Sequence, residues 1–240
     1  MESEESLVTK ITKIYQHGLG VELHVIGDAA ADFTVEALLA CEPLRKEKIS
    51  LASKSGASEI PRPVLIHCQL LKKNTIRKIA EAGICASVQP QFVPTDCRWL
   101  DGMLSDGYLK TTELYPWKTL LDAGVLIGGG SDSPVESAEP LIGMYDAIFR
   151  PSGREEVNKT FRPEECLSFE EALRLYTTNG ARMVEYEEGS GRLETGAVAD
   201  FVVLDTEKFG VEFDIFEDLK VLKDLDVFAT FVGGECVYQK

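Results

Sequence analysis

Basic residues are scarce in this sequence. Lys and Arg number 25 against 40 Asp and Glu, which gives a formal net charge of −15. Lys and Arg form no run longer than two, so the sequence offers no basic stripe that could neutralise a row of phosphates. We therefore expect no nucleic-acid partner and no binding to an anionic membrane surface.

Long apolar runs and paired cysteines are also missing. No stretch approaches the roughly 20 apolar residues that a membrane-spanning helix needs, and the first ten residues, MESEESLVTK, have no apolar core typical of a secretory signal. The absence of any CxxC pair argues against a zinc ribbon or a thioredoxin-like site. We expect a cytoplasmic protein with reduced thiols, several of them inside apolar strands; the six cysteines are Cys41, Cys68, Cys85, Cys97, Cys166 and Cys236.

Apolar runs alternate with segments of helical pattern along the sequence. The chain has 240 residues, of which 44% are hydrophobic, and this is enough to build a substantial core. Strands are predicted at residues 21–27, 63–68, 84–89 and 125–132. Helices are predicted at residues 6–18, 28–41, 72–82, 117–123, 139–149 and 168–186. Near-continuous apolar strands that alternate with helices favour an α/β fold with a parallel sheet covered by helices.

Three further segments have a different character. Residues 45–62 are charged and Ser-rich and predict a surface loop. Residues 90–115 form a long irregular stretch, which is either a lid over a site, with Trp99 and Tyr108, or a packed surface loop. The segments 191–205 and 226–240 are β-rich with Gly turns and predict a small appendage. The expected division is therefore residues 1–188 and 189–240.

Three polar residues near strand ends could carry chemistry. His24, His67 and Asp132 each lie near the end of a predicted apolar strand. In a β/α barrel the carboxyl ends of the strands face one mouth, and two imidazoles with a carboxylate suit Zn²⁺ or another divalent metal. Structural roles stay open for each, as a buried histidine or a turn aspartate. The third histidine, His17, lies at a helix end and is read as structural.

The glycine run 128–130 has two readings as well. Three glycines before Ser131 could cradle a phosphate, but the sequence lacks the Gly-Lys-Ser/Thr of a P-loop. Close approach of the backbone to a barrel mouth explains the glycines equally well.

A set of motifs in a fixed order resembles the amidohydrolase superfamily, in its YtcJ-like branch of metal-dependent enzymes. The motifs are HVIGDAA (24–30), LIHCQLL (65–71), GICASVQPQF (83–92), GGGSDSPVESAEPL (128–141), LSFEEALRLYTTNGAR (167–182), GRLETGAVADFVVLD (191–205) and FVGGECVY (231–238). The resemblance implies a TIM-type (β/α)8 barrel with a small β-sandwich built from both chain ends. In that fold this sequence would supply barrel strands five to eight and the C-terminal part of the sandwich.

The resemblance also implies roles for individual residues. His24, His67 and Asp132 would bind a divalent metal, with zinc the metal expected for this family, and Asp132 would take the proton of an attacking water. Gln69, Gln89 and Ser131 would line the substrate site, with ordinary hydrogen bonding inside the barrel as the alternative. The implied reaction is hydrolysis of a carbon–nitrogen bond other than a peptide bond, in a small amide-like substrate.

The sequence departs from the family pattern at one important point. It contains no His-x-His pair, which in the family lies on the first barrel strand and grips the metal. We therefore expect an incomplete metal site and little activity from this chain alone. A half barrel would also expose strand edges, so we expect a homo-oligomer or association through those edges. The alternative function is a non-catalytic binding or regulatory protein that keeps the amidohydrolase scaffold.

Overall fold

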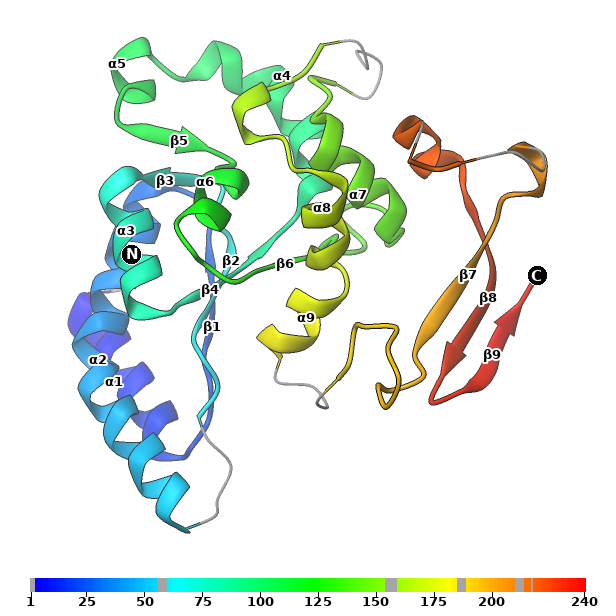
Figure 1. The fold of residues 1–240 in the computed structure, drawn as a ribbon. Helices are drawn as coiled ribbons and strands as arrows, with labels where there is room; N and C mark the ends of the chain where they lie inside the picture. The colour runs from blue at the N-terminus through cyan, green and yellow to red at the C-terminus, as the bar shows by residue number, and fades with distance from the viewer. Residues whose placement is uncertain (1–2, 56–59, 154–158, 185–188, 210–213, 217) are drawn as a thin grey trace. The chain divides into compact units, whose positions relative to one another are not determined.

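The computed structural model describes residues 3–55, 60–153, 159–184, 189–209, 214–216 and 218–240 (Figure 1). The chain divides into two compact units. The first comprises residues 1–88 and 102–127, and the second comprises residues 89–101 and 128–240. The predicted division after residue 188 stays a prediction.

The first unit contains most of a sheet of short strands, and the last of these strands, β6, continues from Ile127 into the second unit. Among the described residues this sheet has four strands in the order β1-β2-β4-β6, and the β1–β2 and β2–β4 pairs are parallel. The amide of Ala86 in β4 donates to the carbonyl of Leu126, just before β6, at 3.0 Å. The parallel α/β arrangement expected from the sequence is confirmed; the strands are β1 (Glu22–Val25), β2 (Val64–His67), β4 (Cys85–Val88) and β6 (Ile127–Gly129).

The two faces of this sheet differ in burial. Val25, Leu65 and Ala86 are fully buried, whereas His24 is exposed and Ile66 is half-buried. Alternation along each strand places these two sets on opposite faces. Helices α1 (Glu4–Gln16), α2 (Asp28–Ser55) and α3 (Lys73–Ala82) lie to one side of the sheet (Figure 1). The other helices that lie wholly in the first unit are α5 (Asp106–Leu109) and α6 (Trp117–Asp122).

Helix α2 is longer than the sequence predicted. The expected loop at residues 45–62 is wrong as far as Ser55, because α2 continues through that residue with Pro43 inside it. Arg45, just beyond the proline, is buried, and its guanidinium donates to the carbonyls of Ile60 and Pro61, each at 3.4 Å. These contacts support the helix where local sequence alone favours a break.

The stretch 90–115 is regular rather than irregular. It contains the 3-10 helix η1 (Pro90–Phe92), α4 (Val93–Met103), α5 and strand β5 (Thr112–Leu114). The side chain of Ser105 caps α5 by accepting from the amide of Tyr108 at 3.3 Å. β5 pairs antiparallel with β3 (Leu70–Lys72), a short strand that the sequence did not signal.

The second unit contains a group of short helices. Helix α7 (Pro140–Phe149) occupies the predicted segment. The predicted helix 168–186 is instead two helices, which break at Tyr176 and Thr177; residues 185 and 186 of the prediction lie outside the described residues. The first of them starts with a capping box formed by Ser168 and Glu171. The remaining helical elements are η2 (Pro163–Glu165), α8 (Phe169–Leu175), α9 (Thr178–Met183), η3 (Glu207–Phe209) and η4 (Leu219–Asp224).

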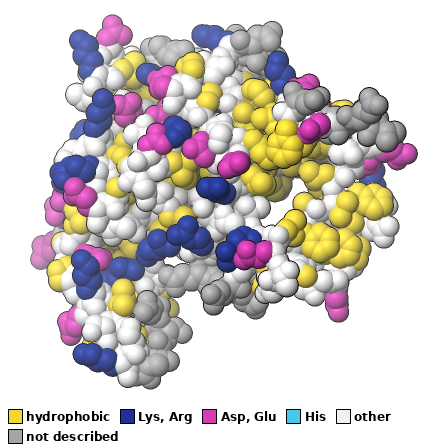
Figure 2. Space-filling view, in the orientation of Figure 1, with side chains coloured by type: hydrophobic (Ala, Val, Ile, Leu, Met, Phe, Trp, Pro, Cys, Tyr) yellow, Lys and Arg dark blue, Asp and Glu magenta, His cyan; other side chains and the backbone are white. Residues whose placement is uncertain are grey.

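The β-rich C-terminal segments form a small sheet, as predicted, and its strands pair antiparallel. Its three strands among the described residues are β7 (Phe201–Asp205), β8 (Asp226–Val232) and β9 (Glu235–Gln239). Phe201 and Phe231 face each other across β7 and β8 with stacked rings 4.5 Å apart. Figure 2 shows hydrophobic side chains gathered over this sheet, and Val202 and Tyr238 are both more than half exposed.

In the parts of the chain that the structure describes, no helix is long and apolar enough to cross a membrane.

Candidate metal-binding site

Two of the three histidines meet at the carboxyl ends of neighbouring strands. His24 lies in β1 and His67 ends β2, and their ring centroids are 4.2 Å apart at an angle of 74°. His24 is exposed to solvent, whereas His67 is only 2% exposed. Imidazole nitrogens are common ligands of zinc and other transition metals, so this pair is a suitable partial donor set. The structure thus brings together the two histidines predicted as ligands.

The backbone at the end of β2 explains how the two rings can meet. The register pairs Val25 with His67 and His24 with Ile66, so regular alternation would direct the two imidazoles to opposite faces. His67 and the following Cys68 instead have positive φ angles of 77° and 52°. We infer that this left-handed turn breaks the alternation and brings the ring of His67 to that of His24.

Several backbone hydrogen bonds hold this turn in place. The amide of Cys68 donates to Val25 O at 3.0 Å, and the amide of Tyr115 donates to Gln69 O at 2.6 Å. Gln69, predicted to line the site, is buried immediately after the turn. The thiol of Cys68 is fully buried, and burial raises its pKa to about 12. The free thiol is therefore protonated at neutral pH.

Asp132 lies in a strained turn of the second unit. Its φ is 57°, its carbonyl accepts from the amide of Val135 at 2.9 Å, and its side chain is exposed. Ser131 orders the same turn, because its hydroxyl accepts from the amide of Ser133 at 3.2 Å. Positive φ at a non-glycine residue is costly, and such residues cluster at functional sites.

The predicted site residues are divided between the two units. His24, His67 and Gln69 belong to the first, and Gln89, Ser131 and Asp132 belong to the second. Gln89 is buried at the start of the second unit. The convergence of Asp132 on the histidines stays a prediction. Within the described residues, no group of three or more His, Cys, Asp or Glu side chains is placed to hold a metal ion.

A charged cluster that the sequence analysis missed follows β1. The ammonium of Lys72 lies 3.7 Å from the carboxylate of Asp28 and 2.6 Å from that of Asp32, which also accepts from the Thr75 hydroxyl. Burial and a hydrogen bond to Asp28 raise the pKa of the Tyr108 phenol. Asp28 is part of the HVIGDAA motif, and that was the available signal. The cluster ties Tyr108 of the proposed lid segment to the residue that starts α2.

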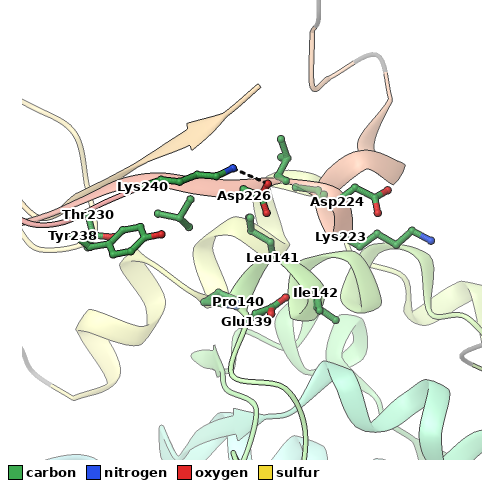
Figure 3. Close-up of a pocket in the computed structure, with 13 residues that line it drawn as sticks. Glu139, Pro140, Leu141, Ile142, Lys223, Asp224, Asp226, Thr230, Tyr238 and Lys240 are labelled. Carbon is green, nitrogen blue, oxygen red and sulfur yellow. Dashed lines mark hydrogen bonds and ion pairs between the residues drawn. The ribbon is translucent and has the colours of Figure 1, made fainter. Parts of the chain in front are cut away.

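The second unit also has a groove with a volume of about 600 Å³, shown in Figure 3. It lies between the start of α7 and the segment from η4 to β9. Lys240 at its edge forms ion pairs with Asp226 and Asp205, each at 3.1 Å. None of the predicted site residues lines this groove, so it is distinct from the strand-end turns.

Comparisons with known proteins place these features in a family. Residues 1–238 match the model of the amidohydrolase family. The chain is 32% identical to the YtcJ protein of Bacillus subtilis over 237 residues, which is 99% of this chain and 41% of that protein. It is 25% identical to the N-substituted formamide deformylase of Arthrobacter pascens, covering 93% of this chain and 37% of the enzyme.

A solved structure shows the same relationship. The crystal structure of an uncharacterized metal-dependent hydrolase from Pyrococcus furiosus matches 83% of this chain and 36% of its own, with 27% identity and a TM-score of 0.60. The chain therefore spans less than half the length of the curated relatives it matches. The match across nearly all 240 residues shows that the chain belongs to the amidohydrolase family.

Proposed function

We propose that this chain carries the C-terminal half of a TIM-type (β/α)8 barrel that hydrolyses carbon–nitrogen bonds other than peptide bonds. In this proposal β1, β2, β4 and β6 are barrel strands five to eight. Residues 189–240 are then part of the accompanying β-sandwich. Family membership, the parallel strand order and the partial coverage of longer relatives support the proposal.

The observation that carries the proposal is the pairing of two imidazoles at the ends of adjacent parallel strands. His24 and His67 would hold a divalent ion through their ring nitrogens, together with Asp132. Such an ion, Zn²⁺ by preference for this donor set, supplies Lewis acidity and lowers the pKa of a coordinated water to about 7.

In this proposal Asp132 accepts a proton, and three polar side chains bind the substrate. The carboxylate of Asp132 accepts the proton that the attacking water loses, and its exposure leaves it accessible to that water. Gln69, Gln89 and Ser131 orient a small amide-like substrate through their side-chain donors and acceptors. The family relative named as a formamide deformylase supports a substrate with a C–N bond.

The set of metal ligands among the described residues is partial, and we therefore expect low hydrolytic activity. Two histidines and one carboxylate are one or more ligands short of the set that the family resemblance implies. We therefore propose that turnover requires residues beyond those described here, from the rest of a barrel. The 240-residue chain by itself should show little hydrolysis.

The test is the metal content of the purified chain after dialysis against zinc, measured by elemental analysis. We expect bound zinc that falls by at least about tenfold in His67→Ala, because one of two imidazole donors is lost. His17→Ala is the matched control, since the His17 ring bonds its own helix at Lys13 O, 2.7 Å away. Equal zinc in His67→Ala and the parent chain would refute the site and favour a non-catalytic binding protein.

A further inference from the structure

The ring of Tyr176 lies against two glycines of the second unit. A Cβ built on Gly129, in β6, would lie 2.8 Å from Cζ and 2.9 Å from Cε2 of Tyr176. A Cβ on Gly143, in α7, would lie 2.7 Å from the same Cζ and would also meet the phenol oxygen. Contacts this short are not tolerated by real side chains. The ring therefore occupies the space that side chains at both positions would need.

The neighbouring glycines show that this contact is selective. A Cβ on Gly128 would meet Cε of Met183 at 2.7 Å, the end of a flexible side chain. A Cβ on Gly130 would meet nothing within 4 Å. The glycine run thus contains one position closed by a rigid ring, one closed by a flexible chain and one that is open. A phosphate-binding loop would not need a side chain packed against one particular glycine. A packing contact of Tyr176 with Gly129 explains why that position is closed while Gly130 is open.

Burial of the phenol strengthens the case for a fixed ring. The hydroxyl of Tyr176 has no hydrogen-bond partner among the described residues, and burial raises its pKa well above the usual value. An unpaired buried hydroxyl costs free energy. The close fit of the ring against Gly129 and Gly143 indicates that its shape fixes its position.

We infer that Tyr176 is a positioning residue for the turn that carries Ser131 and Asp132. The ring packs on Gly129, only three residues before Asp132, and it joins that point to α7 through Gly143. Asp132 has a positive φ, which persists only where the surrounding structure enforces it. The inference rests on the proposed role of Asp132 and adds a residue to that site.

The test compares Tyr176→Phe with Tyr176→Leu in the whole chain. Hydrogen exchange of the segment 126–136 reports on the turn, and the carboxyl ¹³C resonance of Asp132 reports on the side chain itself. We expect Tyr176→Leu to speed exchange in this segment on the order of tenfold and to shift the Asp132 resonance. Tyr176→Phe keeps the ring and should leave both unchanged. Segment 226–232 of β8 is the internal control.

A second pair of variants keeps the test decisive if Tyr176→Leu does not fold. Gly129→Ala should speed exchange as Tyr176→Leu does, and Gly130→Ala, with open space around it, should not. The double variant Gly129→Ala/Tyr176→Leu should exchange more slowly than Gly129→Ala alone, because the smaller side chain makes room for the methyl group.

Three results would overturn the inference. They are equal effects of Phe and Leu at position 176, a uniform rise in exchange across both segments, or an unmoved Asp132 resonance in Tyr176→Leu. None of these measurements involves catalysis. Failure of the proposed function would appear separately, as undiminished zinc binding in His67→Ala.

Discussion

Backbone strain at single residues marks the candidate site. Among the described residues, positive φ occurs at six non-glycine positions, and three of these are His67, Cys68 and Asp132. Each costs on the order of 1–3 kcal/mol relative to a relaxed conformation. Such strain is retained when the residue is needed in that geometry. The strain therefore adds support to the roles proposed for His67 and Asp132, each considered within its own unit.

The ion pair of Asp32 with Lys72 makes a pH-dependent contribution to stability. Burial alone would raise the pKa of Asp32, but hydrogen bonds from Lys72 and Thr75 outweigh it, so the pKa lies below its ordinary value. A carboxyl with a lowered folded-state pKa stabilises the fold above its unfolded pKa, about 3.9, and loses this contribution as the pH falls through the folded value.

We therefore expect Asp32→Asn to lower the melting temperature at about pH 7, and to do so progressively less in acid as the pH falls below the unfolded pKa of about 3.9. Thermal unfolding followed by circular dichroism across this range measures the difference. Asp122→Asn is the control, because Asp122 pairs with Lys118 one helical turn away on the surface. A deficit in Asp32→Asn that is the same at neutral pH and in acid would show that packing, and not charge, is responsible.

At the scale of elements, the sequence was informative where hydrophobic runs are continuous. The runs around Leu65 and Ala86 are buried on one face of a sheet, and their pattern predicts strands without tertiary information. Residues 45–55 were misassigned because their charged, Ser-rich composition is typical of a loop, whereas contacts of the distant carbonyls at Ile60 and Pro61 with Arg45 support the helix. Long-range contacts of this kind leave no local pattern.

The same contrast applies to the candidate site. Histidines at strand ends can be recognised from sequence, since the strand and its polar end are adjacent. The contact of Tyr176 with Gly129 joins residues 47 positions apart and depends on side-chain shape. Strand β3 and its pairing with β5 were missed for a similar reason, because each strand is only three residues long.

The end of α3 depends on a glycine in the left-handed conformation. Gly83 follows the helix with φ 65°, and its amide bonds back to the carbonyl of Ala80 at 3.1 Å. A Cβ there would meet no atom within 4 Å, so only backbone strain opposes a side chain. We expect Gly83→Ala to lower the free energy of unfolding by about 1 kcal/mol.

Chemical denaturation of Gly83→Ala and Gly107→Ala provides the comparison. Gly107 lies inside α5, has no positive φ, and has only the Ser105 hydroxyl at 3.9 Å from a built Cβ. Alanine at this position should be neutral or stabilising by up to about 1 kcal/mol. Equal destabilisation of the two variants would contradict the role given to the left-handed cap.

At the scale of the whole molecule, exposed apolar surface and net charge act in opposite directions. Val202 and Tyr238 are 54% and 51% exposed, and both pair with Thr230, which places them on one face of the C-terminal sheet. β1 and β6 end the parallel sheet of the described residues without a further strand. Open edges and apolar faces favour association, whereas a charge of −15 opposes it.

We therefore expect the chain to self-associate, and to do so more strongly as salt screens its charge. The Debye length falls from about 10 Å at 0.1 M to about 3 Å at 1 M salt, which weakens repulsion but leaves apolar contacts intact. Sedimentation should show mass above 26.5 kDa that increases with salt. Val202→Lys/Tyr238→Lys should shift it towards monomer, and Leu19→Lys, at an exposed apolar residue outside the sheet, should not. A monomer at every salt concentration would mean that the exposed sheet face does not drive association.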